Sequence, residues 1–327
     1  MRHVLQAFTD PVAPLDTSAL RRLAKARAPR FALAWTIRRA MPQGCRYFNV
    51  GHTNLTDRHL TALKDCTITI LLHDTIPLDL PDLQKEGTPE IFEAKLSAAV
   101  KHADRLIYIS DQTRTDVARH ATGPIPPGLV APIGVDLPDP APNDIPANLP
   151  MDGPVFVTLG TIEPRKNHAF LLDLWEQLGE DAPTLLICGH RGWRNEDVFV
   201  RLDTSPMMNR TVFECPDLSD GAVAAILERA TAFLWPSLAE GYGLPPLEAA
   251  ARGTPVLCAP LPVTQELLGD VAIYADLSDF DTWRAEIRRL AQMKRADRPD
   301  PVTPPDWDSH FALVLDAAGG SQTSGQV

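Results

Sequence analysis

Long apolar runs are absent from the 327-residue sequence. No stretch approaches the roughly 20 apolar residues that a membrane-spanning helix needs. The opening residues, MRHVLQAFTDP, lack the apolar core and the small-residue cleavage site of a secretory signal. We therefore expect a cytoplasmic protein, which would meet a membrane only peripherally, at the inner face.

Paired cysteines are absent too. The chain has five scattered cysteines and no Cys-x-x-Cys motif: Cys45, Cys66, Cys188, Cys215 and Cys258. The odd number and the irregular spacing favour neither a zinc site nor a disulfide framework. We expect reduced, buried cysteine side chains.

Two cofactor motifs are missing. No Gly-x-Gly-x-x-Gly fingerprint of dinucleotide binding occurs, and Pro246 stands at the third glycine position of GYGLPP. This argues against a nicotinamide-dependent dehydrogenase. No lysine lies between Asn167 and Gln292, where a phosphorylase that uses pyridoxal phosphate would need one. Phosphorolysis is therefore disfavoured.

The charge is unevenly distributed. A formal net charge of −11 argues against nucleic acid as a partner. Acidic residues are nevertheless absent from Thr17 to Thr56, where eight basic residues lie. This segment, residues 17–56, is either a solvated helix face or a surface for weak contact with an anionic membrane or an acceptor phosphate.

Short apolar segments alternate with segments of helical pattern along the whole chain. Strands are predicted at residues 2–8, 47–50, 67–74, 105–110, 155–160, 184–189, 211–215, 232–237, 255–259 and 271–275. Helices are predicted at residues 89–103, 112–120, 169–178 and 221–230. Such alternation predicts an α/β protein with parallel sheets covered by helices on both faces.

The segments divide into two Rossmann-like domains whose sheets face a central cleft. We assign residues 1–135 to the first domain and residues 153–300 to the second. Prolines between them, in residues 136–152, favour a linker. Residues 319–327 are rich in Gly, Ser and Gln, which predicts a disordered tail.

The segment AEGYGLPPLEAAARGTPVL, residues 239–257, places two carboxylates around a turn. Pro245 suits the first turn of a helix, and Gly253 suits its end. Gly241 and Gly243 allow close approach of the backbone to a ligand, beside a helix N-terminus that favours phosphate. Glu240 and Glu248 would then reach hydroxyl groups on either side of the phosphates. A sugar linked through a diphosphate to a ribose has this arrangement.

This segment resembles the Glu-x7-Glu region of glycosyltransferase family 4, whose members have the two-domain GT-B fold and retain the anomeric configuration of the sugar. VTLGTIEPRKNH, LSDGAVAAILERATAFLWPS and LPVTQELLGDVAIYAD resemble the neighbouring family segments in the same order. The likeness covers roughly residues 153–276. It is weaker in the first half, which is short for the family.

The resemblance implies roles for individual residues. Catalytic roles fall on Glu240 at the donor sugar, on Lys166 and Arg165 at the diphosphate, and on His73, from ILLHDTIPL, near the sugar. Binding of the nucleotide sugar falls on Glu248 at the ribose and on Gly160, Thr161, Gly241, Gly243 and Leu244 around the phosphates. Thr161 departs from the arginine that many members carry after this glycine.

The acceptor side is less determined. Ser110 suits a helix N-cap, with a donor contact as the alternative. Residues 51–55, GHTNL, either face the acceptor or form a turn. The resemblance also implies that residues 301–318 form a final helix that packs back toward the first domain.

No metal or other cofactor is expected. The Asp-x-Asp triplets at Asp279 and Asp306 fall at predicted helix starts, where aspartate caps backbone amides. The hypothesis is a retaining hexosyltransferase. It would move a hexose or deoxyhexose, mannose as the first candidate, from a nucleoside-diphosphate sugar to a glycan or lipid-linked acceptor in polysaccharide synthesis. A partner of glycan assembly that binds sugar nucleotides without turnover is the alternative.

Overall fold

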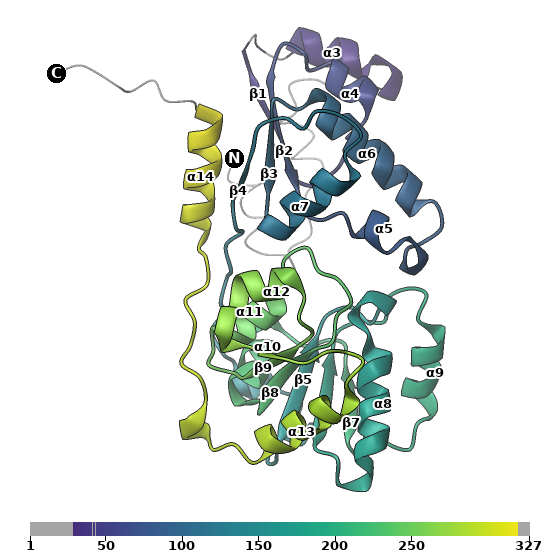
Figure 1. The fold of residues 1–327 in the computed structure, drawn as a ribbon, viewed down its shortest axis with the longest axis vertical. Helices are drawn as coiled ribbons and strands as arrows, with labels where there is room; N and C mark the ends of the chain where they lie inside the picture. Colours follow the sequence, from purple (N-terminus) through teal and green to yellow (C-terminus); the bar gives the residue numbers. More distant parts are fainter. Residues whose placement is uncertain (1–28, 41, 43, 320–327) are drawn as a thin grey trace, which may run out of the picture.

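The chain folds into two α/β domains, each built on a parallel sheet (Figure 1). The computed structural model describes residues 29–40, 42 and 44–319. The strand predicted at residues 2–8, residues 17–28 of the basic segment and residues 320–327 of the predicted tail lie outside the described residues. The predicted class, two parallel-sheet α/β domains, is confirmed.

The N-terminal domain carries a four-stranded sheet in the order β1-β2-β3-β4. Its strands are β1 (Arg46–Asn49), β2 (Thr67–Leu72), β3 (Arg105–Tyr108) and β4 (Gly128–Val130). Its helices are α3 (Leu33–Ala40), α4 (Asp57–Thr61), α5 (Ile76–Asp79), α6 (Thr88–His102) and α7 (Asp111–His120). The sequence analysis missed β4 because this short strand lies among prolines, which argue against a strand.

The C-terminal domain carries a six-stranded parallel sheet in the order β10-β9-β8-β5-β6-β7. The strands are β5 (Val155–Leu159), β6 (Thr184–Cys188), β7 (Val212–Cys215), β8 (Ala232–Trp235), β9 (Val256–Cys258) and β10 (Ile273–Tyr274). The helices are α8 (His168–Leu178), α9 (Glu196–Thr204), α10 (Asp220–Arg229), α11 (Leu244–Ala250), α12 (Pro262–Leu268) and α13 (Phe280–Ala291). All six strands were predicted, whereas the helices α9 and α12 were not.

The strand order of this sheet fixes where a ligand binds. Counted from β5 as the first strand, the order is the 3-2-1-4-5-6 order of dinucleotide-binding domains. The order reverses between β5 and β8, which are direct neighbours. The loops that leave the carboxyl ends of these two strands therefore diverge and open a crevice.

Apolar side chains cover both faces of this sheet, because parallel strands between helix layers are buried on both sides. In β5, Phe156 joins a cluster with Trp175 and Trp283, whereas Val155 and Val157 join the cluster on the opposite face. None of the five is more than 2% exposed. This two-sided core holds the strand ends, and so the loops that follow them, in fixed positions.

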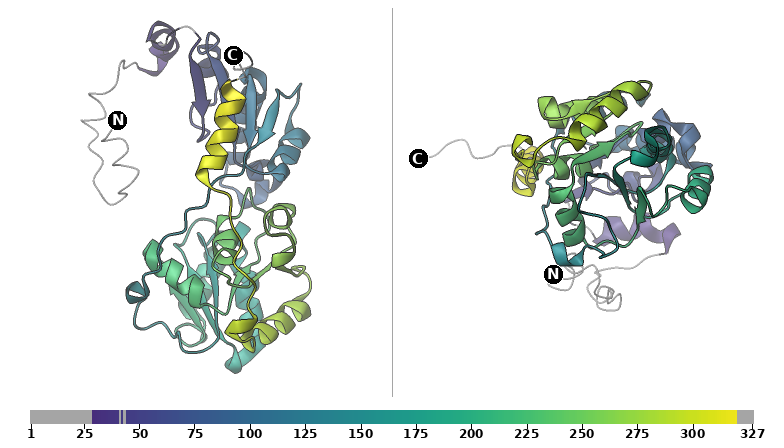
Figure 2. Two further views of the ribbon diagram at one scale, coloured as in Figure 1. Left: turned by 90° about the vertical axis from the view of Figure 1, so that its left-hand side faces the viewer. Right: turned by 90° about the horizontal axis from the view of Figure 1, so that it is seen from below.

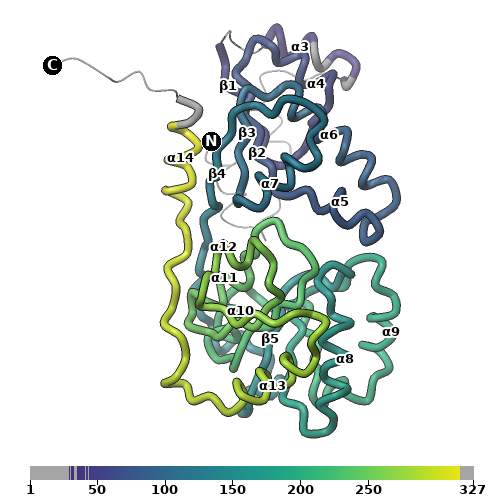
Figure 3. Tube along the Cα trace, in the orientation of Figure 1, coloured from purple at the N-terminus to yellow at the C-terminus, as the bar shows by residue number. Residues whose placement is uncertain are grey.

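Within the described residues, the chain passes between the domains twice (Figures 2 and 3). One passage follows β4, and the other leads from α13 to α14 (Trp307–Gly319) beside the N-terminal domain. The two passages touch, since the amide of Val135 donates to the carbonyl of Pro305 at 3.0 Å. His310 Nδ1 in α14 lies 3.2 Å from the carbonyl oxygen of Ala131. The final helix thus packs on the end of the N-terminal sheet.

The segment predicted as a linker, residues 136–152, is held against the C-terminal domain. The amide of Ala141 donates to the carbonyl of Gly221 at the start of α10, at 2.8 Å. Ser219 donates to Asp144 at 3.0 Å. These contacts keep the connection close to α10.

The expectation of five reduced cysteines is wrong for one pair. Cys45 and Cys66 form a disulfide, with their Cα atoms 4.6 Å apart. They lie immediately before β1 and β2, which are paired, so the fold brings together residues that are 21 positions apart. Cys188, Cys215 and Cys258 are free and buried, as predicted.

None of the helices among the described residues is long and apolar enough to cross a bilayer.

His168 is a buried histidine that has no hydrogen-bond partner among the described residues. It is 1% exposed, and neither ring nitrogen is bonded. Burial, helped by the charge of Lys166, lowers the pKa of His168 from 6.5 to about 4. Between these pH values the unfolded chain binds a proton that the folded chain does not. The stability contributed by the neutral ring is therefore complete above pH 6.5 and is lost as the pH falls toward 4.

Replacing this histidine should weaken the acid sensitivity of the fold. Between pH 7 and pH 4 the free energy of unfolding of the native chain should fall by about 3 kcal/mol more than that of His168→Leu, because only the native chain must charge this ring. Urea denaturation across this range measures both. The exposed His190, changed to Leu, is the control and should follow the native curve. If the free energies of unfolding of His168→Leu and the native chain changed in parallel with pH, the lowered pKa of His168 would be contradicted.

Candidate active site

The candidate site lies where the order of the C-terminal sheet reverses. The loop after β5 contains the 3-10 helix η4 (Pro164–Lys166), and the loop after β8 contains Glu240. The carbonyl of Arg165 accepts from the amide of Leu238 at 2.9 Å, which fastens the two loops together. This contact brings Lys166 and Glu240, which are 74 positions apart in the sequence, within hydrogen-bond distance.

Glu240 is the centre of an ion-pair cluster. Its side chain is only 7% exposed, and its two oxygens lie 2.7 Å from Lys166 Nζ and 2.7 Å from Arg165 Nη1. Arg165 also donates to Glu163 Oε1 at 2.6 Å and to the carbonyl of Ala239 at 2.8 Å. The structure thus brings together three of the four predicted catalytic residues.

Because these side chains are buried, the pKa of each cation depends on the charges of its neighbours. Desolvation lowers the pKa of Lys166, although Glu240 acts against it. Desolvation also acts to lower the pKa of Arg165, but Glu240 and Glu163 outweigh it, so this pKa is raised. Lys166 Nζ lies 3.9 Å from the ring centroid of Trp235, a cation–π contact that offsets part of its lost hydration. A fixed, partly dehydrated pair of cations results.

Two glycines shape the loops beside Lys166. Gly160 has φ +140°, a backbone conformation that residues with a side chain rarely adopt, and a Cβ there would make an ordinary contact of 3.5 Å with Lys166 Cε. Gly189, with φ +150°, approaches so closely that a Cβ would lie 2.1 Å from the carbonyl oxygen of Gly160. Thr161 is exposed. It contributes no charge where the resembling family often has arginine, so Arg165 is the second cation of the cluster.

The N-terminal domain touches this site at Gly241. A Cβ at Gly241 would lie 2.5 Å from the carbonyl oxygen of His73 and 2.8 Å from Asp74 Cβ. The carbonyl of Gly241 accepts from Ser110 Oγ at 3.0 Å. Thr113 Oγ1 donates to the carbonyl of His73 at 3.1 Å. Glycine at position 241 therefore lets the two domains meet.

The side chain of His73 lies against the loop after β1. Its Nε2 is 2.7 Å from the carbonyl oxygen of Val50, and its ring is 5.0 Å from that of His52. Burial lowers the pKa of His52 to about 4, helped by His73. His52 and Asn54 have positive φ, so GHTNL forms a turn, one of the two predicted outcomes.

Glu248 lies on α11 and faces a separate cavity of about 340 Å³. Apolar side chains of Leu159, Val223 and Leu227 line this cavity together with Asp220. Burial raises the pKa of Glu248. The two glutamates of the predicted motif thus lie in different parts of the site, Glu240 in the ion-pair cluster and Glu248 in the cavity.

The caps predicted at Ser110, Asp279 and Asp306 are confirmed. Gly243, predicted only to bind phosphate, is the N-cap of α11 with φ +113°, and Pro245 lies in the first turn as predicted. Ser110 caps α7 by accepting from the amide of Thr113. Asp279 caps α13, and Asp306 accepts from the amide of Ser309 at the start of α14. The expectation that no metal is needed stays a prediction.

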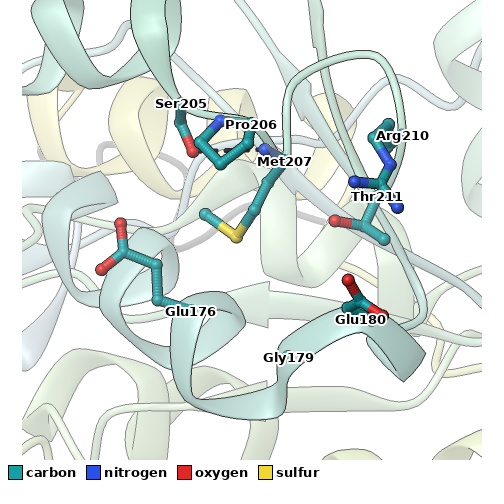
Figure 4. A pocket seen from close by; sticks show the side chains of 8 residues that line it. All are labelled: Glu176, Gly179, Glu180, Ser205, Pro206, Met207, Arg210 and Thr211. Atoms are coloured by element: carbon teal, nitrogen blue, oxygen red, sulfur yellow. Dashed lines mark hydrogen bonds between the residues drawn. The ribbon is translucent and has the colours of Figure 1, made fainter.

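A different cavity, of about 480 Å³, lies at the opposite end of the sheet (Figure 4). Its walls come from the end of α8 and the residues that precede β7, and Met207 lies between Glu176 and Thr211. Since ligands of open parallel sheets bind at the carboxyl ends of the strands, this cavity carries no assignment.

Two polar residues of the site escaped the sequence analysis. Glu163 is 4% exposed and pairs with Arg165, and Asp74 is held by the contact at Gly241. Each adjoins a predicted residue in the sequence, within EPRK and HD. A carboxylate next to a functional residue is the signal that could have identified both.

The architecture is that of the GT-B glycosyltransferases. Anabaena Alr3699/HepE, crystallised with UDP and glucose, superimposes with a TM-score of 0.65 at 16% identity, over 89% of this chain and 81% of that one. The apo structure of OtsA superimposes with a TM-score of 0.61 at 14% identity, over 90% and 76%. These likenesses establish the fold alone.

The sequence relatives are more specific. Residues 142–297 match the family model of glycosyl transferases group 1, and this range contains the ion-pair cluster and Glu248. Over 221 residues the chain is 33% identical to the serotype-specific mannosyltransferase WbdA of Escherichia coli, covering 62% of this chain and 27% of the relative. It is also 33% identical to the O-antigen chain mannosyltransferase B of Escherichia coli, covering 41% and 36%. The chain thus spans only about a quarter of the length of WbdA, 27%.

Adding one methyl group at Gly241 should push the domains apart. The new Cβ would overlap the backbone of His73, so we expect Gly241→Ala to lose about 1–3 kcal/mol of unfolding free energy. The radius of gyration in X-ray scattering should also rise. Gly153→Ala is the control, because a Cβ there meets nothing within 4 Å. If both variants match the native chain, the domains do not meet at residue 241.

Proposed function

We propose that this chain is a retaining glycosyltransferase. It would move a hexose or deoxyhexose, mannose as the first candidate, from a nucleoside-diphosphate sugar to a hydroxyl of a glycan or lipid-linked acceptor in cell-surface polysaccharide synthesis. The observation that carries the proposal is the cluster of Glu240, Lys166 and Arg165 at the reversal point of the sheet. The resemblance to family 4 and the mannosyltransferase relatives support it.

The cluster suits a diphosphate. Glu240 compensates two cations that are largely buried, and leaving such cations unpaired is costly. The oxygens of a diphosphate are suitable replacement partners for Lys166 and Arg165. Glu240 is then released to accept hydrogen bonds from hydroxyls of the donor sugar. One carboxylate would thereby be a counterion before the donor binds and a sugar ligand afterwards.

The cavity at Glu248 suits the nucleoside. Its carboxylate is an acceptor for ribose hydroxyls, as the resemblance implies, and the apolar walls offer a surface for the flat base. In the sequence, Gly243 lies between Glu240 of the ion-pair cluster and Glu248 of this cavity. A nucleoside, a diphosphate and a sugar would therefore be held in that order along one path.

The reaction follows from this placement. The bond between the sugar anomeric carbon and the diphosphate oxygen breaks, and the acceptor oxygen forms its bond on the same face. The acceptor proton passes to the leaving diphosphate, whose growing charge Lys166 and Arg165 stabilise. His73 approaches from the N-terminal domain, and closure of the two domains excludes water. Retention rests on the family resemblance, and no pair of residues here identifies a covalent nucleophile.

Other parts of the proposal rest on the sequence alone. These are the cytoplasmic location, the absence of a metal requirement, the absence of nucleic acid as a partner, and weak membrane contact through residues 17–56. The alternative of a non-catalytic sugar-nucleotide binder has no support from the relatives. Thermal stabilisation by a panel of UDP- and GDP-sugars would identify the donor, since a ligand that binds only the folded state raises Tm.

Replacing Glu240 with glutamine should nearly abolish transfer. The variant keeps an oxygen but loses the negative charge that binds sugar hydroxyls, so kcat/KM for the best donor should fall by about 100-fold or more. Release of nucleoside diphosphate measures the rate. Glu180→Gln, an exposed change at the far end of the domain, should behave as the native chain. Undiminished turnover of Glu240→Gln would refute its role, and a native chain that binds donors without releasing product would support the non-catalytic alternative.

Removing the lysine should weaken the diphosphate site. In Lys166→Ala one of the two buried cations is lost, so the Kd for GDP or UDP in calorimetry should rise by about tenfold or more. Lys294→Ala, an exposed lysine after α13, is the matched control. An unchanged Kd in Lys166→Ala would remove this residue from the donor site.

A further inference from the structure

A further cavity adjoins the ion-pair cluster, since Glu163 and Arg165 form part of its wall. It has a volume of about 190 Å³ and lies between the domains. The N-terminal domain contributes Asp74 and Gln84, and the C-terminal domain contributes Glu163, Arg165 and Trp193. Because both domains supply its walls, the cavity exists only while they are together.

Arg165 is the wall that this cavity shares with the donor site. One nitrogen of its guanidinium group contacts Glu240 at 2.7 Å, and the other contacts Glu163 at 2.6 Å. A ligand in the cavity would therefore lie one side chain away from the carboxylate that we assign to the donor sugar. An acceptor hydroxyl held there would be close to a sugar bound at Glu240.

The polar groups of the cavity are suited to hydroxyls. Glu163 and Asp74 are carboxylates, which only accept hydrogen bonds when ionised, and Arg165 only donates. Asp74 Oδ1 accepts from the amide of Ile76 at 3.1 Å, which fixes the side chain, and burial raises its pKa. Sugar hydroxyls both donate and accept, so they match a mixed set of this kind.

Trp193 supplies an aromatic surface in the same cavity. It follows β6, and its ring lies 4.9 Å from Lys85 Nζ of the N-terminal domain. Arg194 next to it donates to the carbonyl of Gln84, so the indole is held at the junction of the domains. The flat face of an indole packs well on the C–H face of a pyranose ring, and pockets for small ligands combine such a surface with a few polar groups.

We propose that this cavity is the acceptor subsite, in which a pyranose ring of the acceptor packs on Trp193 and bonds to Asp74 and Glu163. The inference rests on the proposed transferase function. It makes Trp193 and Asp74 determinants of acceptor binding, and it makes the meeting of the domains a requirement for an acceptor site.

The test measures acceptor and donor separately. The purified full-length chain is given GDP-mannose and UDP-glucose as donors, and methyl α-glycosides of mannose, glucose and galactose as acceptors. In Trp193→Ala the KM for the acceptor glycoside should rise about tenfold or more, whereas the Kd for GDP or UDP in calorimetry should not change. Trp193→Phe keeps an aromatic face and should restore most of the affinity. Phe311→Ala, an exposed aromatic on α14, is the control.

The outcomes distinguish this inference from the proposed function. An acceptor KM in Trp193→Ala and Asp74→Asn within twofold of the native value, with nucleotide release intact, would overturn the subsite and leave the transferase standing. A rise in donor KM alone would assign the cavity to the donor sugar and also overturn it. If no glycoside accelerates nucleotide release above the rate with water, the cavity is not an acceptor-sugar site. A native chain that releases no nucleotide from any donor would instead refute the transferase.

Discussion

The site depends on one buried carboxylate shared by two cations. Glu240 bonds Lys166 and Arg165 within 2.7 Å, and each partner would be costly to bury alone. The loops after β5 and β8 are therefore tied to each other by charge as well as by backbone. An anion that enters must exchange with this carboxylate instead of simply adding to it. If a diphosphate binds here as proposed, its binding and the release of Glu240 would be coupled by that constraint.

The same loop joins the domains. Gly241 follows the shared carboxylate directly, and its lack of a side chain lets the backbone reach His73. Ser110 both caps α7 and donates to the carbonyl of Gly241. A displacement of Glu240 would thus also move Gly241, the next residue, which contacts the N-terminal domain. In the proposed function, donor binding and domain closure would share this short path.

The sequence predicted the C-terminal domain well because its signals are local. Continuous apolar strands, the prolines of PRK and LPP, and caps such as Asp279 each act within a few residues. The Cys45–Cys66 disulfide was missed because it depends on which strands become neighbours. Glu163 was missed although its pairing with Arg165 lies within one loop, two residues apart. The short β4 among prolines was missed because its pairing with β3 outweighs local preference. Periodicity cannot carry such long-range information.

Donor and acceptor sides also differ in how they are built. The ion-pair cluster and the Glu248 cavity use strand ends of one sheet, whose order fixes them. The cavity at Trp193 combines loops of two domains, so its shape depends on their relative position. Loop residues change with little effect on either core, whereas the diphosphate is common to all nucleoside-diphosphate donors. Under the proposed function, a chain of this kind could therefore change its acceptor while it keeps the cluster at Glu240.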